Sequence, residues 1–546
     1  MYAIFSALPI ALVIILMSFF KQKASSALLF GWVLAVLLSI LIWNMEVVHA
    51  AAWTLFGFLS AIGVLLIIFA AIFMLNTLLE LRFIETIGNG FSGITQDRRI
   101  QIIIIAWFFG AFIEGAAGFG TPQAIAAPLL VGLGVPAFFA AMAALIANAG
   151  ATIFGAAGTP TTAGWNSIVD SVIYQYGEYT AASIFAELNN RIALTNIFIS
   201  VFLPFIMIAS VTARDGRKRG IKDALPVLPL CIFAGLVYAI PSWFVSFLGP
   251  QLPTLAGAII GMPIFLLIVK LGFLVPKDTY RFIDDKIKES KKVATTGIPL
   301  VTAWLPYAII ILVLVITRLP WLGFDSYLNP LNAHVSITSI LGFEGINWSF
   351  NPLWNPGIFP FIPVTILLLV FRKTEVKVVT KITVKTLKQL KHASVALFFG
   401  VALVQIMLNT NFTNPTAGPN AMTSEIALAL SSLFGGAYLA VAPFIGILGS
   451  FVSGSTTVSN IMFYGLQMEA ALALNLPIVI SLVAQTMGAS AGNMVAINNI
   501  VAVSATTGYN GKESTLMVAT LIPMVLYALA VAVVLYTFFA IGIRLG

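Results

Sequence analysis

The chain has 546 residues, of which 60% are hydrophobic and only 9% are charged, whereas a soluble globular protein is about 25% charged. This composition excludes an ordinary soluble protein, a nucleic-acid-binding protein and a disordered chain. The chain is nevertheless basic, because 28 Lys and Arg against 20 Asp and Glu give a net charge of +8. One Cys excludes a disulfide framework, and three scattered His residues do not suggest a metal site, so neither metal nor cofactor is expected. We therefore expect an all-α polytopic membrane protein.

The apolar stretches predict the membrane spans, because a transmembrane helix needs about 20 mostly apolar residues. Twelve stretches meet this requirement, near residues 3–20, 26–44, 51–79, 136–158, 190–212, 225–245, 253–275, 299–318, 353–371, 394–410, 476–498 and 515–541. Two more, 100–134 and 436–470, are interrupted by Gly, Ser, Thr and Pro, and we expect re-entrant helical hairpins there. The polar stretch 372–391 is expected to be an amphipathic or solvated cytoplasmic connector.

The cations indicate the orientation, because Lys and Arg in short loops stay on the cytoplasmic side. With residues 21–25 placed inside and the sides alternating from there, 25 of the 28 Lys and Arg fall inside. This alternation of sides along the chain holds only if each of the two broken stretches enters and leaves the membrane on the same side. Both termini are then predicted to be extracytoplasmic.

A short sequence recurs at an offset of 333 residues: Phe73-Met-Leu-Asn-Thr77 matches Ile406-Met-Leu-Asn-Thr410, and Gly155 meets Gly488. A short amphipathic segment, a broken stretch and a full span follow in the same order in both copies. The first copy ends on the cation-rich side and the second on the cation-poor side, which predicts inverted repeats. Repeats of this kind with interrupted helices are typical of secondary transporters.

These observations give a domain organisation for a single transporter domain, residues 1–546. We expect repeat 1 at about 51–212 with hairpin 100–134, central scaffold spans and loops at about 213–371, and repeat 2 at about 394–541 with hairpin 436–470. The repeated Asn76 and Asn409 are expected to form hydrogen bonds that pack helices.

The first broken stretch contains glycines that let the backbone leave the helix, namely Gly115, Gly118 and Gly120. Thr121 can cap the returning helix, and Pro122 suits its first turn. The N-terminal end of this helix would lie at membrane depth, where its N–H groups favour an anion. We expect these residues to belong to a substrate-binding site.

The second broken stretch offers hydroxyl and amide groups that could also bind an anion, namely those of Ser453, Ser455, Thr456, Thr457, Ser459 and Asn460. Neither break contains Lys or Arg, and neither do spans 136–158 and 476–498. Backbone N–H groups, helix ends and hydroxyls therefore have to hold an anionic substrate. This favours a small monocarboxylate over a di- or tricarboxylate, unless a co-transported ion supplies the missing cation.

Glu114 is an acidic residue at membrane depth flanked by glycines, and ionisable groups at such depth are costly and usually functional. We interpret it as the proton-coupling carboxylate; the alternative is a structural carboxylate that accepts backbone N–H bonds. Asn148 and Asn493 on the adjacent spans are candidate substrate ligands. Their amides could instead pair with buried backbone.

Three strings stand out along the chain: Ile113-Glu-Gly-Ala-Ala-Gly-Phe-Gly-Thr-Pro122, Leu448-Gly-Ser-Phe-Val-Ser-Gly-Ser455 and Ala491-Gly-Asn-Met494. In these strings the chain resembles the lactate permease family. The resemblance implies uptake of L-lactate, D-lactate and glycolate with protons, two hairpins in inverted repeats, an elevator mechanism and a prokaryotic plasma membrane. Some members carry Asp at the position of Thr456 and Lys at that of Asn493, so here both charges of a possible buried pair are absent together.

We therefore expect a proton symporter for L-lactate and related 2-hydroxy monocarboxylates. Its hairpin tips would move with spans 136–158 and 476–498 against a scaffold of the remaining helices. The alternatives are a sodium-coupled carrier of another small organic anion on the same fold, and an anion channel. An enzyme is not expected, because the sequence has no His/Cys/Asp cluster, no nucleophile with a nearby base and no nucleotide loop. The expected partners are the anion, H⁺ and the lipid bilayer, with no nucleic acid, and a homo-oligomer stays open.

Overall fold

The computed structural model describes residues 1–20, 22–90, 94–118, 121–217, 219–284, 297–319, 322–328, 335–411, 419–509 and 511–541. These residues are almost wholly helical; the exception is a small antiparallel sheet of β1 (Val335–Ile337) and β2 (Trp348–Phe350). Eleven of the described helices are long and apolar enough to cross a membrane, or up to twelve if one bent pair counts as a single span. The prediction of a helical polytopic membrane protein is confirmed.

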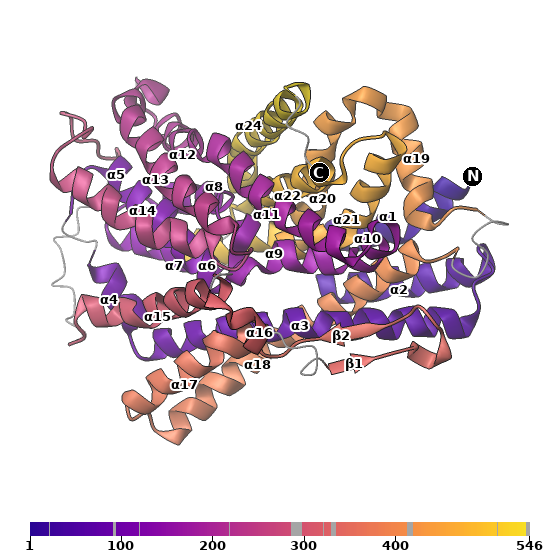
Figure 1. Ribbon diagram of the computed structural model, residues 1–546. Coiled ribbons are helices and arrows are strands. Elements are labelled where there is room, and N and C mark those ends of the chain that lie inside the picture. Colours follow the sequence, from indigo (N-terminus) through magenta and orange to yellow (C-terminus); the bar gives the residue numbers. More distant parts are fainter. Residues whose placement is uncertain are drawn as a thin grey trace.

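Two groups of helices lie one above the other in Figure 1. The lower group contains α2 (Ala24–Leu41), α3 (Val47–Glu80), α4 (Phe83–Asn89), α15 (Leu300–Arg318), α16 (Phe324–Leu328), η7 (Ile340–Gly342), η8 (Gly357–Phe361), α17 (Ile362–Phe371) and α18 (Val376–Leu408). Beside both groups lie α1 (Tyr2–Ser18) and α19 (Met422–Phe434), which pack against each other.

The upper group contains both broken stretches. Its first part comprises α5 (Arg98–Ile102), η1 (Ile103–Phe109), α6 (Gly110–Ala117), α7 (Thr121–Gly132), α8 (Ala137–Asn148), η2 (Thr152–Phe154), α9 (Gly155–Asn166), α10 (Val169–Tyr176), α11 (Glu178–Ser200), α12 (Leu203–Thr212), η3 (Gly220–Asp223), η4 (Leu225–Val227), α13 (Leu228–Ser246) and α14 (Pro253–Lys270). Its second part comprises η9 (Gly435–Ala437), α20 (Tyr438–Ser453), α21 (Thr456–Ala473), α22 (Ile478–Gly492), α23 (Ile497–Thr507) and α24 (Glu513–Ala540).

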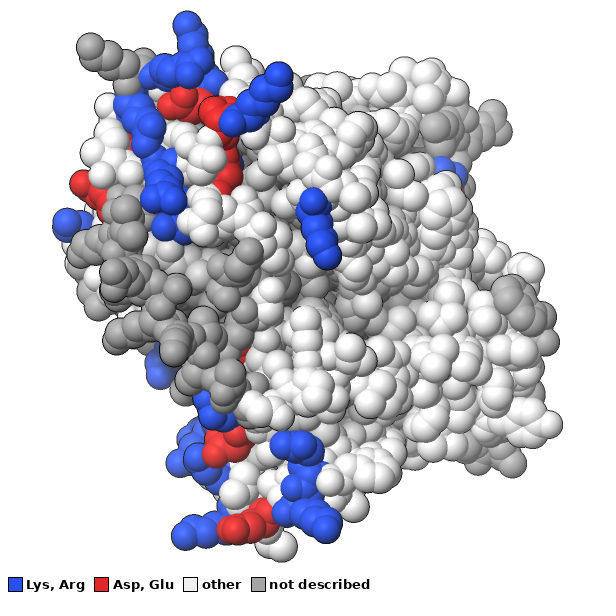
Figure 2. Space-filling view, turned by 90° about the vertical axis from the view of Figure 1, so that its left-hand side faces the viewer, with Lys and Arg blue, Asp and Glu red and all other residues white. Residues whose placement is uncertain are grey.

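Charge is distributed unevenly over the surface. Lys and Arg gather along the left edge of the face in Figure 2, and most of the remaining face carries no charged side chain. Large apolar side chains are exposed instead on several helices, such as Val301 on α15 (81%) and Val370 on α17 (65%). Such a surface is suited to contact with lipid rather than water.

The long helices α3 and α18 run antiparallel and form the centre of the lower group. Gly57 of α3 meets Ala402, Asn76 donates hydrogen bonds to Thr386 (3.0 Å) and Gln389 (2.7 Å), and Lys381 pairs with Glu80 (2.6 Å). The predicted packing role of Asn76 is confirmed. Asn409, in contrast, donates to the Gln405 carbonyl one turn earlier in its own segment (2.9 Å).

The amphipathic character predicted for 372–391 is confirmed, but the stretch is not a separate connector, because α18 begins at Val376 and continues through it. The lysines of this stretch made it look solvated. However, Ile382 is 1% exposed and Thr386 is buried, so one face of the helix packs on other helices while Lys377, Lys381 and Lys385 stay at the surface.

Both predicted breaks coincide with real interruptions. In the first, α6 ends at Ala117 and α7 begins at Thr121; in the second, α20 ends at Ser453 and α21 begins at Thr456. The two helices of each pair pack against each other, as the arms of a hairpin do. Gly118 (φ +60°) and Gly454 (φ +71°) supply the left-handed backbone that each turn requires.

The spans 136–158 and 476–498 are not the continuous helices that we expected. Helix α8 ends at Asn148, and the chain resumes at Thr152 with a bend of 55°. Helix α22 ends at Gly492, and α23 begins at Ile497. The apolar side chains of these spans hid the breaks, because hydropathy does not register where the backbone leaves the helix.

We expect Gly57→Ala to lower the melting temperature of the purified protein, because a Cβ there would lie 2.6 Å from the Ala402 backbone. Overpacking of this kind costs about 1–3 kcal/mol. Gly400→Ala on α18 is the matched control, since its Cβ would meet nothing closer than 3.6 Å. Equal melting temperatures for the two variants would contradict the close α3–α18 crossing.

Candidate functional site

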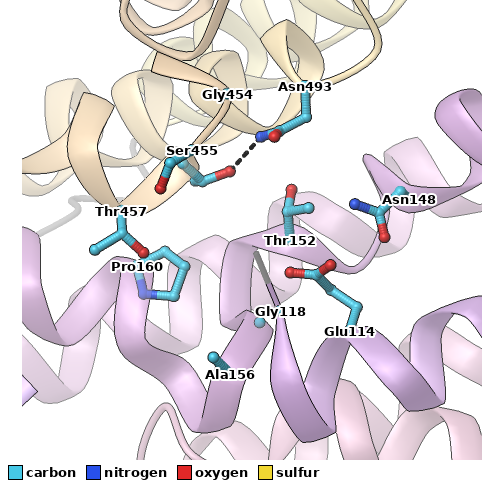
Figure 3. Close-up of a pocket in the computed structure, with 12 residues that line it drawn as sticks. Glu114, Gly118, Asn148, Thr152, Ala156, Pro160, Gly454, Ser455, Thr457 and Asn493 are labelled. Carbon is cyan, nitrogen blue, oxygen red and sulfur yellow. Dashed lines mark hydrogen bonds between the residues drawn. The ribbon is translucent and has the colours of Figure 1, made fainter. Parts of the chain in front are cut away.

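A narrow cavity lies where the four helix interruptions of the upper group meet (Figure 3). The described residues that line it are Glu114, Gly118, Asn148, Thr152, Gly155, Ala156, Pro160, Gly454, Ser455, Thr456, Thr457 and Asn493. Figure 3 shows Glu114, Asn148 and Thr152 on one side, and Gly454, Ser455, Thr457 and Asn493 on the other. The lining is polar and includes one carboxyl group, and none of these twelve residues is Lys or Arg.

Glu114, on α6, is the acidic residue of this cavity and is 4% exposed. Its carboxyl group packs against Gly155 and Gly118: a Cβ at Gly155 would overlap Oε1, and one at Gly118 would lie 3.4 Å from it. Asn148 is its neighbour in Figure 3, and Oε2 has no partner among the described residues. A carboxyl oxygen in this position can take up a proton or accept a hydrogen bond.

Two helix N-terminal ends point into the cavity. Ser455 is the N-cap of α21, its Oγ accepting a bond from the Val458 N–H (3.3 Å), and Thr456 and Thr457 form the first turn. Pro160 stands at the start of the right-handed part of α9. The N–H groups and dipoles of such ends favour a bound anion.

A left-handed turn precedes that part of α9 and shapes the cavity wall. Ala156 (φ +43°), Ala157 (φ +53°) and Gly158 (φ +78°) are all left-handed. An alanine in this conformation costs about 1–2 kcal/mol, so the surroundings must hold the turn in place. Thr159 Oγ1 donates to the Ala156 carbonyl and Thr161 Oγ1 to the Ile153 carbonyl (2.9 Å), which supports backbone pairing by these two threonines.

Thr456 and Asn493, the two positions that the resemblance singled out, are in direct contact. Asn493 Nδ2 donates to Thr456 Oγ1 (2.6 Å), the bond drawn in Figure 3. Asn493 also donates to the Ala489 carbonyl (3.1 Å), and its Oδ1 accepts from Asn499 (2.9 Å). Neither side chain of this pair is left with an unpaired buried polar atom among the described residues.

Seven of the residues singled out from sequence therefore line the cavity: Glu114, Gly118, Asn148, Ser455, Thr456, Thr457 and Asn493. Gly120 lies outside the described residues. Gly115 does not line the cavity but packs against Leu255 and Thr254 of α14. Thr121 is the first residue of α7, where its N–H donates to the Gly118 carbonyl (3.1 Å).

Three polar residues of the second hairpin also lie outside the lining, and they pair with backbone. Ser453 Oγ donates to the Gly449 carbonyl (2.7 Å), Ser459 Oγ to the Gly446 carbonyl (2.8 Å) and Asn460 Nδ2 to the Pro160 carbonyl (3.1 Å). They hold the hairpin and α9 in shape behind the cavity.

Thr152, Gly155, Ala156, Pro160 and Gly454 line the cavity but were not among the predicted ligands. A signal for three of them was present in the sequence: Gly115-Ala-Ala-Gly118 is followed by Thr121-Pro122, and Gly155-Ala-Ala-Gly158 is followed by Thr159-Pro160. The same Gly-Ala-Ala-Gly…Thr-Pro pattern thus marks two helix interruptions, and its recurrence could have revealed the second.

Comparison with known proteins points to one family. The model of the L-lactate permease family matches residues 2–542. A putative L-lactate permease of Haemophilus influenzae is 28% identical, with 97% of each chain covered. The glycolate permease GlcA of Escherichia coli is 27% identical over 97% of this chain and 94% of its own. The solved YdaH transporter of Alcanivorax borkumensis is 13% identical over 74% of this chain and 88% of its own, with a TM-score of 0.32.

We expect Thr456→Asp alone, or Asn493→Lys alone, to destabilise the protein, because a buried charge without its partner costs about 3–5 kcal/mol. The double variant should recover most of this loss, since the two side chains already touch. Melting temperatures of the four proteins form the double-mutant cycle. Thr456→Val is the uncharged control and should cost only about 1 kcal/mol; additive effects of the two charges would contradict the pairing.

Proposed function

The chain belongs to the L-lactate permease family, and from this we propose that it is a secondary active transporter that takes up L-lactate by proton symport. D-lactate and glycolate are the related 2-hydroxy monocarboxylates that it would also carry, across a prokaryotic plasma membrane. The observation that carries the proposal is the cavity itself, where helix N-terminal ends, hydroxyls and amides surround one buried carboxyl group.

The substrate carboxylate would bind at the N-terminal ends of α21 and α9, near Ser455, Thr457 and Pro160. Its 2-hydroxyl group would meet the amide and hydroxyl groups of Asn148 and Thr152, and Thr456 and Asn493 would complete the polar wall. One negative charge matches the partial positive charge of helix ends. A second or third carboxylate would have no cation among the lining residues to meet it.

Glu114 would carry the coupled proton. Its ionised form and a substrate carboxylate would repel each other strongly in a cavity of low effective dielectric. The protonated form removes this repulsion, so proton and anion would favour each other's binding, as linkage requires. Uptake of the anion alone is thereby disfavoured, and this is the condition for symport.

The element order supports the inverted-repeat organisation at about 51–212 and 394–541, around a central part at about 213–371. In the first repeat, α3 is followed by the hairpin α6–α7 and by the interrupted pair α8–α9. In the second, α18 is followed by the hairpin α20–α21 and by α22–α23. We infer that the two hairpins are re-entrant and enter from opposite sides. The cation-rich side would be cytoplasmic, and both termini extracytoplasmic.

For an elevator mechanism we infer a larger moving body than the hairpins with their adjacent spans. Helices α11 and α24 pack against α22, and α12 packs against α8. Helix α14 packs against α6, and α13 packs against α14. The moving body would then be the upper group of Figure 1, and α3, α15, α17 and α18 would form the scaffold.

Counterflow in proteoliposomes tests the function. Vesicles loaded with unlabelled L-lactate should accumulate labelled L-lactate, and D-lactate and glycolate should compete while citrate should not. No exchange with any of these monocarboxylates would refute the proposed substrate. Uptake driven by a Na⁺ gradient but not by a pH gradient would refute proton coupling, and large unitary currents would indicate a channel.

Glu114→Gln should retain counterflow but lose accumulation driven by a pH gradient, because the amide mimics the protonated carboxyl and cannot release a proton. Glu469→Gln is the control. Glu469 is a half-buried glutamate, bonded to Ser424 (2.9 Å) at the far end of α21 and absent from the cavity lining. If Glu114→Gln still drives uphill uptake from a pH gradient, the carboxyl group is only structural.

A further inference from the structure

The break after α8 leaves the Ala149 and Gly150 carbonyls without a backbone partner among the described residues, and the Ala151 carbonyl has only a long bond from the Phe154 N–H (3.4 Å). Side chains from five surrounding helices bind these three carbonyls. The Gly150 carbonyl accepts from Asn196 of α11 (3.1 Å) and Tyr238 of α13 (3.3 Å). The Ala151 carbonyl accepts from Thr254 of α14 (2.9 Å). The Ala149 carbonyl accepts from Ser490 of α22 and from Tyr527 of α24 (3.4 Å).

All five donors are at most 1% exposed, and none of them lines the cavity. They therefore reach the break from behind, while Asn148 and Thr152, at either end of the three braced peptides, form part of the cavity wall. Ser490 continues the link, because its Oγ lies 2.6 Å from Thr152 Oγ1. The position of these two cavity residues depends on the five donors.

The bonds also have an electrostatic consequence. A helix C-terminus carries partial negative charge on its last carbonyls, which opposes an anion nearby. Donors that bind these carbonyls offset that charge, so the N-terminal ends of α9 and α21 dominate the field in the cavity. Unpaired carbonyls at the same place would instead suit a bound cation.

We propose that Asn196, Tyr238, Thr254, Ser490 and Tyr527 form a positioning shell for the anion site, which we call the carbonyl brace. The brace holds Asn148 and Thr152 in place and masks the negative end of α8. Its residues do not touch the substrate. The effect of the brace on transport rests on the proposed function. Its structural role, which is to hold the backbone between Asn148 and Thr152, does not.

Thr254 gives the sharpest test, because its two branches act on different neighbours. Its Oγ1 donates to the Ala151 carbonyl. Its methyl group packs over Gly115, since a Cβ built on Gly115 would lie 3.1 Å from that methyl carbon. Thr254→Val keeps the shape and removes the hydroxyl, whereas Thr254→Ser keeps the hydroxyl. Tyr238→Phe removes a second donor. Tyr307→Phe is its control, because the buried Tyr307 hydroxyl has no partner among the described residues.

Hydrogen–deuterium exchange of the intact protein measures the brace without any substrate. We expect faster exchange in the peptide covering 147–155 for Thr254→Val and Tyr238→Phe, and wild-type exchange for Thr254→Ser and Tyr307→Phe. Unchanged exchange in both of the first two variants would overturn the brace.

Transport kinetics measure its consequence. Loss of one hydrogen bond should raise the KM for L-lactate about three- to tenfold in Thr254→Val, with a smaller change in maximal rate, and Thr254→Ser should restore it. A wild-type KM in Thr254→Val would overturn the positioning role. If the wild-type protein itself shows no lactate counterflow, the proposed function fails, while the exchange experiment still decides on the brace.

Discussion

Interrupted helices inside a membrane-spanning body impose one constraint on the rest of the structure: every backbone group that leaves a helix needs another partner there. In this chain the interruptions after α6, α8, α20 and α22 meet at one cavity. The freed carbonyls after α8 are bound by side chains of α11, α13, α14, α22 and α24, so the packing of those helices follows from the break that they serve.

Hydrogen bonds between side chains also join the second hairpin to the helix that follows it. Gln467 joins Tyr438 (2.7 Å) to Gln485 (3.1 Å), and Gln485 continues to Ser459 (3.0 Å), so hydrogen bonds run from α20 and α21 into α22. Apolar packing between helices gains little from the hydrophobic effect in lipid, where hydrogen bonds and close contact matter more. The tip at Gly454 is therefore fixed relative to α22, and the two elements form one unit.

The sequence was sufficient to locate the hairpin breaks, because Gly118 and Gly454 stand where the backbone turns left-handed. Hydropathy was not sufficient for the break after Asn148, since the apolar side chains continue through it. Gly150 and the Gly-Ala-Ala-Gly…Thr-Pro pattern at 155–160 are the signals that the sequence offers there. Nor could residue type separate Thr456 and Asn493, which line the cavity, from Ser459 and Asn460, which pair with backbone. Hydroxyls and amides suit both roles, and only the position of the nearest carbonyl decides between them.

The lengths of α3 and α18 have a consequence for how the protein sits in lipid. They contain 34 and 33 residues, which makes each about 50 Å long, whereas a hydrocarbon core is about 30 Å thick. The pair has to cross the bilayer obliquely or extend beyond it at its ends. The contacts of Asn76 and Glu80 with α18 fix the register between the two helices. A change in bilayer thickness would thus change the tilt of α3 and α18 together, and the two helices would not slide along each other.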